Sequence, residues 1–196
     1  MRFVVAIALL AAPAWAEGTI IVSPIYNQLV ALPVPAGFAA GFENEADGSY
    51  ILELIPAGET VDTWSQMITL TGGRGLAGKA SVAQMASFLA DGYQKACPGS
   101  FTAHQLAPPA IRGAGAVFAG YLGCGTAGPQ AEAMVFVVLQ GQSDMYTMQW
   151  AERGPAVPHP VEPDAAVWRS RVEALGLSRV CDIVAGEAAP YPSCTE

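Results

Sequence analysis

Alternating side chains along the chain predict a protein rich in β-strands. Between residues 49 and 55, Tyr50, Leu52 and Leu54 alternate with a second set of side chains that includes Glu53. A period of two is typical of a strand whose two faces meet different surroundings. Other runs of strand length are rich in β-branched and apolar residues. The strands expected, in chain order, are 19–22, 28–34, 38–43, 49–55, 64–71, 101–105, 114–124, 131–140 and 145–151.

Two segments have helical spacing instead. Segment 81–96 places apolar residues at intervals of three and four, and Ser81 with Gln84 fits a capping box that satisfies backbone amides of the first turn. A second helix is expected to begin after a cap at Asp164 and to end at Gly176. Its apolar face carries Trp168, Val172 and Leu175.

The order of these elements predicts the fold class. The strands are grouped around two separated helices, without the regular alternation of strand and helix that builds a parallel sheet. We therefore expect an α+β fold with a mainly antiparallel sheet and two principal helices packed on it. The sequence contains no internal repeat and no linker long enough to divide it, so a single domain is expected.

The beginning of the chain predicts export. A basic residue precedes an uncharged apolar stretch at 3–12, and Ala14 and Ala16 present the small side chains that signal peptidase requires. Residues 1–16 are therefore expected to be a signal peptide cleaved after Ala16, leaving 17–196 as one periplasmic or secreted domain. The apolar stretch is shorter than the roughly 20 residues that cross a bilayer. No membrane span is expected in the mature chain.

The net charge of the chain limits the classes of partner that the sequence predicts. The formal net charge is −8 at pH 7, and a negative surface repels phosphate backbones and anionic lipids. Nucleic acid is therefore not an expected partner. The partner is instead expected to be a periplasmic protein or a component of the cell envelope.

Four cysteines remain after the predicted cleavage site. An even number in an exported protein predicts two disulfides, for which three connectivities exist. Pairing of neighbours in sequence favours Cys97–Cys124 and Cys181–Cys194. A zinc or redox site is the alternative, but the sequence lacks a Cys-x-x-Cys pair and closely spaced histidines.

Two glycine patterns match the dinucleotide motif, one at 73–78 and one at 123–128. A dinucleotide site also requires an acidic residue at the end of a second strand about 20 residues later. After the first pattern, that distance falls inside the expected helix 81–96. Because the chain contains 21 glycines, we interpret both patterns as turns and close packing, and no cofactor is expected.

Catalytic and metal motifs are also missing from the sequence. Neither Gly-x-Ser-x-Gly nor His-Glu-x-x-His occurs, and His104 and His159 are the only histidines. His104 is a candidate general base, or else a surface or half-buried strand residue. Glu43, Glu45 and Asp47 resemble the start of a calcium loop whose remainder is absent. A solvated turn is favoured there, and no metal is expected.

The most distinctive segment is 55–71, in which a turn carrying Glu59 leads to Trp64. We expect Trp64 to anchor this turn in the core. The alternative is an exposed ring beside Glu59 on a binding surface. Trp150 has the same two interpretations.

A family resemblance rests on the same segment, the helix after it and the closing helix, through Pro56, Gly58, Glu59, Trp64, Thr69 and Trp168. In outline, most of 28–180 resembles a group of small exported bacterial proteins and, more distantly, the PsbP/Mog1-like α/β sandwich. This resemblance implies an antiparallel sheet with helices on its faces. Members of that fold are largely noncatalytic and assist larger complexes, so the resemblance brings no catalytic residues.

Three functions remain open. The favoured one is a noncatalytic periplasmic binding or assembly module for a protein or envelope partner. The second is a periplasmic hydrolase using His104, and the third is a small-ligand carrier. The carrier's cleft would be lined by Trp64, Trp150 and Tyr146. Residues expected to contribute to binding are Glu59, Trp64, Trp150 and His104.

Overall fold

The computed structural model describes residues 18–195. The predicted signal peptide lies outside these residues. Within them the chain forms a seven-stranded sheet, a three-stranded sheet and three helices. Among the described helices, none is long and apolar enough to cross a membrane.

The larger sheet is antiparallel between every pair of neighbouring strands. From one edge to the other its strands are β3 (Phe38–Ala46), β4 (Ser49–Pro56), β5 (Gln66–Gly73), β9 (Met145–Pro155), β8 (Gln130–Gln140), β7 (Val117–Ala127) and β6 (Phe101–Leu106).

The smaller sheet joins the beginning of the described chain to its end. A hairpin of β1 (Thr19–Ile25) and β2 (Gln28–Val34) pairs through β2 with the late strand β10 (Arg179–Asp182). The short helix α3 (Pro192–Thr195) follows, and a disulfide ties its Cys194 to Cys181 of β10.

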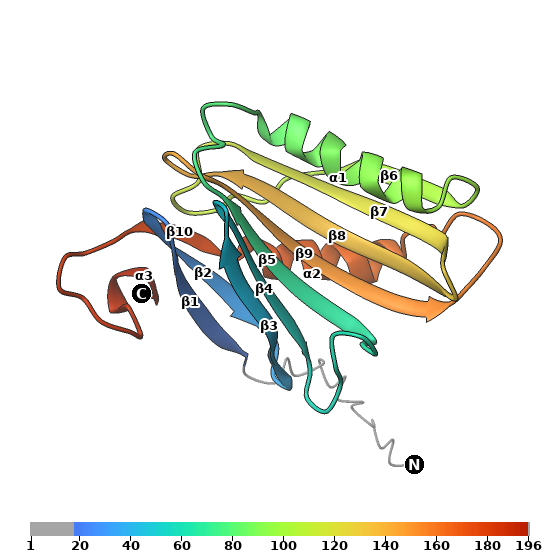
Figure 1. Ribbon diagram of the computed structural model, residues 1–196, viewed down its shortest axis with the longest axis horizontal. Helices are drawn as coiled ribbons and strands as arrows, with labels where there is room; N and C mark the ends of the chain where they lie inside the picture. Colours follow the sequence, from blue (N-terminus) through green and yellow to red (C-terminus); the bar gives the residue numbers. More distant parts are fainter. Residues whose placement is uncertain (1–17, 196) are drawn as a thin grey trace, which may run out of the picture.

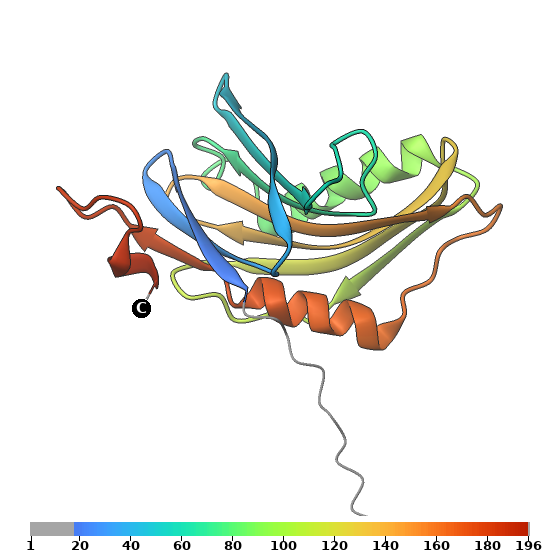
Figure 2. The same ribbon diagram turned by 90° about the horizontal axis from the view of Figure 1, so that it is seen from below.

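Two longer helices pack on opposite faces of the larger sheet (Figures 1 and 2). Helix α1 (Val82–Ala96) contacts β6, β7 and β8 on one face. Helix α2 (Ala165–Gly176) lies on the other face, which it shares with the smaller sheet. The predicted α+β class and the two principal helices are therefore confirmed.

Alternation along the strands places the two larger apolar clusters on opposite sides of the larger sheet. Leu52, Leu54 and Trp150 face the smaller sheet and α2, in one cluster with Trp168. On the opposite side of the same sheet, the buried residues packed with the partly buried face of α1 include Leu122, Met134, Phe136, Val138 and Trp64. The sheet is thus buried on both sides beneath α1, but not along its whole width.

Local sequence signals account for the helix ends. The Ser81 and Gln84 side chains form the predicted capping box, and the Asp164 side chain accepts hydrogen bonds from the amides of Ala166 and Val167. Both predicted disulfides are present, and Cys97–Cys124 fastens the end of α1 to β7. The caps fix where α1 and α2 begin, and the first disulfide ties α1 to the sheet that it covers.

Some element boundaries differ from expectation. Strand β10 and helix α3 lie in a tail for which no regular structure was expected, because they form through pairing with β2 and through the second disulfide. Trp64 does not open a strand, since β5 begins only at Gln66. Strand β3 extends to Ala46, beyond the predicted end at residue 43.

Candidate functional site

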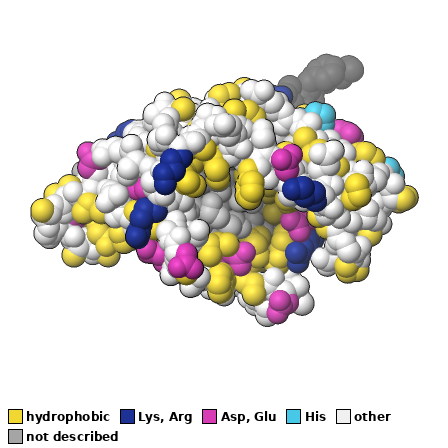
Figure 3. All heavy atoms as spheres, turned by 45° about the horizontal axis from the view of Figure 1, so that its top comes forward, with side chains coloured by type: hydrophobic (Ala, Val, Ile, Leu, Met, Phe, Trp, Pro, Cys, Tyr) yellow, Lys and Arg dark blue, Asp and Glu magenta, His cyan; other side chains and the backbone are white. Residues whose placement is uncertain are grey.

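Part of the larger sheet is left uncovered on the side of α1. We call this area the open face, formed by the side of β3, β4, β5 and β9 that faces in the same direction as α1. In Figure 2 the β3–β4 hairpin and α1 rise on this side with the loop after β4 between them, and Figure 3 shows the molecule hollowed near its middle. The side chains that the strand register places on the open face include Phe42, Ile51, Glu53, Thr69, Thr71 and Gln149.

One row of side chains crosses the open face from strand to strand. Phe42 of β3 is paired with Glu53 of β4, Glu53 with Thr69 of β5, and Thr69 with Gln149 of β9. Side chains opposite one another in an antiparallel sheet lie about 4.5–5.5 Å apart at Cβ. The row therefore presents an aromatic ring, a carboxylate, a hydroxyl and an amide side by side.

Glu53 is the unusual member of this row. Its side chain is half-buried, and burial raises its pKa from the ordinary value of 4.5. Within residues 18–195, no hydrogen bond or ion pair reaches its carboxylate. Partial burial of an unpaired charge is unfavourable, so this carboxylate is available to a ligand.

The other polar side chains of the open face bind one another. The hydroxyls of Thr71 and Thr147 are 2.6 Å apart, and the amide nitrogen of Gln149 donates to the Thr147 hydroxyl over 3.3 Å. Using its nitrogen in this way leaves the amide oxygen of Gln149 as an acceptor. Phe42, at the other end of the row, is 46% exposed. The open face thus combines apolar surface with hydrogen-bond acceptors.

The loop between β4 and β5 borders the open face and contains two of the predicted binding residues. The Glu59 carboxylate accepts hydrogen bonds of 2.6 Å from both the amide and the hydroxyl of Ser65, and these bonds lower its pKa. Trp64 is buried in the cluster beneath α1, and the guanidinium of Arg153 lies 3.8 Å from its ring centroid. Glu59 therefore closes the loop, while Trp64 anchors it in the core.

Trp150 and Tyr146 lie on the opposite side of the sheet from Trp64. Both belong to the cluster that faces α2 and the smaller sheet. The Trp150 ring nitrogen donates to Gln66 over 2.9 Å, and Tyr146 is fully buried. The expected cleft lined by Trp64, Trp150 and Tyr146 is therefore wrong, because the sheet itself separates Trp64 from the other two rings.

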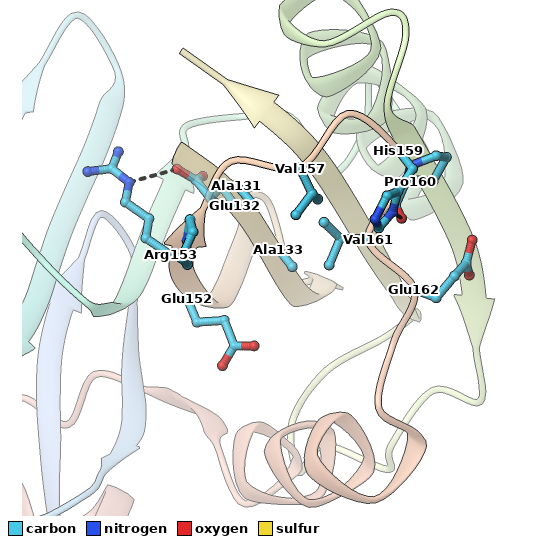
Figure 4. Close-up of a pocket in the computed structure, with 12 residues that line it drawn as sticks. Ala131, Glu132, Ala133, Glu152, Arg153, Val157, His159, Pro160, Val161 and Glu162 are labelled. Atoms are coloured by element: carbon cyan, nitrogen blue, oxygen red, sulfur yellow. Dashed lines mark hydrogen bonds and ion pairs between the residues drawn. The ribbon is translucent and has the colours of Figure 1, made fainter. Parts of the chain in front are cut away.

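A cavity of about 500 Å³ lies between the ends of β8 and β9 and the segment 155–162 (Figure 4). Figure 4 shows Val157 and Val161 pointing toward Ala133. At the edge of the cavity, Arg153 and Glu132 form an ion pair of 3.1 Å, and Tyr93 of α1 donates to the same carboxylate over 2.7 Å. Glu152, which also lines the cavity, is paired with Arg171 of α2 over 2.6 Å.

The second glycine pattern has a structural role beside this cavity. A Cβ on Gly123 would lie 2.5 Å from the carbonyl oxygen of Val161, and one on Gly125 would clash with the carbonyl oxygen of His159. Absence of a side chain thus lets the segment 155–162 lie directly against β7. The amide of Val157 completes this contact by donating to the Gly125 carbonyl over 2.8 Å.

The first glycine pattern also has a structural role, because one of its amides binds a side chain of the protein. The amide of Gly75 donates to the carboxylate of Asp144 over 2.7 Å, and Asp144 is fully buried. Gly75 adopts a φ of +68°, which glycine accepts without strain. A side chain of the protein therefore binds the amide of the second glycine in this pattern.

His104 of β6 is exposed and lies beside Glu162, one of the residues that line the cavity. Its Nε2 is 3.0 Å from the Glu162 carboxylate. Among residues 18–195, no hydroxyl or thiol is hydrogen-bonded to this ring. The described geometry therefore contains a His–Glu pair without the nucleophile that a triad requires.

The acidic turn of β3 and β4 is bound by neighbouring side chains. Glu43 accepts a hydrogen bond of 2.7 Å from Tyr50, and Glu45 forms an ion pair of 2.9 Å with Arg74. Across the described residues, no group of three or more His, Cys, Asp or Glu side chains is arranged to hold a metal ion.

Sequence reasoning missed the open face. The alternation around Glu53 predicted a strand with unlike faces, but not which face remains uncovered. That depends on α1 packing over β6, β7 and β8 rather than over β4 and β5, which is a non-local contact. The only local signal was a carboxylate among apolar residues on a strand.

Comparisons with known proteins concern the fold. No protein-family model matches the chain, and no curated protein matches it. Among solved structures, it is similar to the Ran-binding protein Mog1p of Saccharomyces cerevisiae, with 11% identity and a TM-score of 0.43, over 79% of this chain and 84% of that one.

Two further solved structures are similar at the same level. Cyanobacterial PsbP (CyanoP) from Synechocystis is 8% identical, with a TM-score of 0.47, over 87% of this chain and 94% of that chain. LpqN, involved in cell envelope biogenesis of Mycobacterium tuberculosis, is 11% identical, with a TM-score of 0.40. The match covers 84% of this chain and 91% of LpqN. Two of these structures, Mog1p and PsbP, carry the names of the fold that the sequence resembles.

Proposed function

We propose that this protein is a noncatalytic binding module that acts outside the cytoplasm and holds a protein or cell-envelope partner on its open face. One observation carries the proposal. A strip of the larger sheet, lined by Phe42, Glu53, Thr69 and Gln149, has no helix of residues 18–195 over it, although α1 covers β6, β7 and β8 on the same side. A sheet face with apolar and unpaired polar groups is a surface that a partner can cover.

The disulfides support a location outside the cytoplasm. Cys97–Cys124 and Cys181–Cys194 use all four cysteines of the chain, and structural disulfides persist in oxidising compartments. The predicted signal peptide at 1–16 points to the same location, which for the proposed function is the periplasm or the cell exterior.

Site-directed photocrosslinking tests the proposal. A photoreactive p-benzoylphenylalanine replaces Phe42 on the open face in one variant and Phe88 in a control variant. Phe88 is 71% exposed on α1, outside the open face. Each variant is irradiated in extract from the source organism, and adducts are identified by mass spectrometry.

The expected result is one defined adduct from position 42 that is absent from position 88 and is competed by excess unmodified protein. The purified partner should then bind Phe42→Ala at least about tenfold more weakly than Phe88→Ala, because central aromatic residues dominate most interfaces. Adducts that are equal at both positions, or binding insensitive to Phe42→Ala, would contradict the proposal.

The cavity in Figure 4 favours a second candidate, a small-ligand carrier. Its volume of about 500 Å³ lies within the range of small-molecule sites. Native mass spectrometry of freshly purified protein should then show a co-purifying mass that is lost in Ala131→Trp, which fills the cavity, and retained in Glu53→Gln. A clean unliganded mass for the wild type would argue against a carrier.

A further inference from the structure

We propose that the occupant of the open face is a protein segment with a basic side chain, most simply a lysine, whose ammonium group binds Glu53. This inference rests on the proposed function and specifies the chemistry of the partner. It starts from a carboxylate that is half-buried and has no partner among the described residues.

The surroundings of Glu53 offer acceptors for a donor-rich cation. The hydroxyl of Thr69 lies across from it on β5, and the amide oxygen of Gln149 lies one strand further. Since Gln149 donates its nitrogen to Thr147, its oxygen remains as an acceptor. An ammonium group has three donors and no acceptor, which matches a carboxylate flanked by such groups.

Phe42 supplies the apolar part of the same site. It is paired with Glu53 across the β3–β4 ladder and is 46% exposed. A lysine stem buries its methylene groups along apolar surface while its charge stays at a polar position. A cation above an aromatic face is attracted in addition by the ring quadrupole.

Two arginines near these strands are already paired with other carboxylates. Arg74 is paired with Glu45 and lies 4.4 Å from the ring centroid of Tyr26. Arg153 is paired with Glu132 and stacked on Trp64. Neither arginine is paired with Glu53, which has no ion-pair partner among residues 18–195. The net charge of −8 also favours the approach of a basic segment.

Amide NMR with defined peptides tests this inference. The probes are Ac-Val-Thr-Lys-Val-Thr-NH₂ and the same peptide with norleucine, which keeps the stem and removes the charge, in place of lysine. Butylammonium serves as the isolated cation. Wild type, Glu53→Gln and a control, Glu173→Gln, are titrated with each probe. Glu173 is exposed on α2, away from the open face.

The expected result is saturable shifts at Thr69 and at the Gln149 side-chain amide with the lysine peptide alone. Affinity should fall about tenfold or more in Glu53→Gln, because a charged hydrogen bond is lost, and should be unchanged in Glu173→Gln. Equal binding of the norleucine peptide would overturn the role of charge. Equal binding of butylammonium would overturn a protein segment as the occupant.

Absence of shifts with every probe would also overturn the inference. The proposed function is judged separately, by crosslinking from position 42, which requires no basic residue in the partner. A defined adduct there, together with failure of the lysine peptide, would therefore identify an open face that binds a partner of different chemistry.

Discussion

The carboxylate of Asp144, in the turn between β8 and β9, accepts a hydrogen bond of 2.7 Å from the backbone amide of Gly75, in the loop after β5. Asn27, in the turn of the β1–β2 hairpin, approaches the second carboxylate oxygen at 3.5 Å. One fully buried side chain thus joins three turns at the same end of the molecule.

Asp144→Ala should lower the free energy of unfolding by about 2–3 kcal/mol, because it leaves the amide of Gly75 without a partner. Asp144→Asn keeps an acceptor oxygen, so its free energy of unfolding should fall by less. Urea denaturation at pH 7 measures both. A loss below about 0.5 kcal/mol for Asp144→Ala would show that the turns hold together without this carboxylate.

Glu53→Gln should leave the isolated protein slightly more stable at pH 7, by less than about 0.5 kcal/mol given partial exposure. Burial raises the pKa of Glu53 above 4.5, so the folded state binds the proton more tightly than the unfolded state. The penalty for the charged form is present above the folded pKa and disappears as pH falls below the unfolded value.

Denaturation of the wild type and of Glu53→Gln at pH 7 and at pH 3.5 checks the sign of this difference in unfolding free energy. The two unfolding free energies should differ at pH 7 and converge at pH 3.5, while Glu173→Gln should match the wild type at both. A destabilised Glu53→Gln at pH 7 would reveal a favourable partner for this carboxylate within the folded chain.

Replacing Cys97 and Cys124 together by Ala should cost about 3.5 kcal/mol, and replacing Cys181 and Cys194 about 3 kcal/mol, as upper expectations from loop entropy. The sequence separations are 27 and 13 residues, and the longer loop restricts the unfolded chain more. Thermal and urea unfolding of each double variant gives the comparison. Unchanged stability in either would mean that its disulfide does not restrain the unfolded state.

Gly125→Ala should destabilise the fold by about 1–3 kcal/mol through overpacking. Its new Cβ would clash with the carbonyl oxygen of His159 and lie 2.6 Å from that of Val157, forcing the segment 155–162 away from β7. Gly154→Ala is the matched control, because its Cβ would meet nothing within 4 Å. Equal unfolding free energies for the two variants would contradict close packing at Gly125.

Elements with strong local signals were predictable from sequence. Ser81 and Gln84 marked the start of α1, and the period of two at 49–55 marked β4. By contrast, Arg179–Asp182 is too short to show a period, and it becomes a strand only by pairing with β2. Local patterns cannot identify an element whose stability comes from a partner that is distant in sequence.

The same contrast between local patterns and distant contacts applies to the candidate site. Sequence reasoning favoured core positions for Trp64 and Trp150, and both are only 6% exposed, whereas their alternative role on a binding surface requires exposed rings. Glu53 was visible only as one polar position in a strand. Its significance comes from the sheet around it, which α1 does not cover, and from the lack of an ion-pair partner in the part of the chain that the structure describes. Both depend on how distant elements pack.

The pairing of β2 with β10 also determines when folding can finish. Gln28 is in register with Asp182, so the second edge of β2 is completed by the last strand that the structure describes. Because a polypeptide is synthesised from its N-terminus, that edge stays unpaired until residues 179–182 have followed. The small sheet therefore makes completion of the fold conditional on delivery of nearly the whole chain.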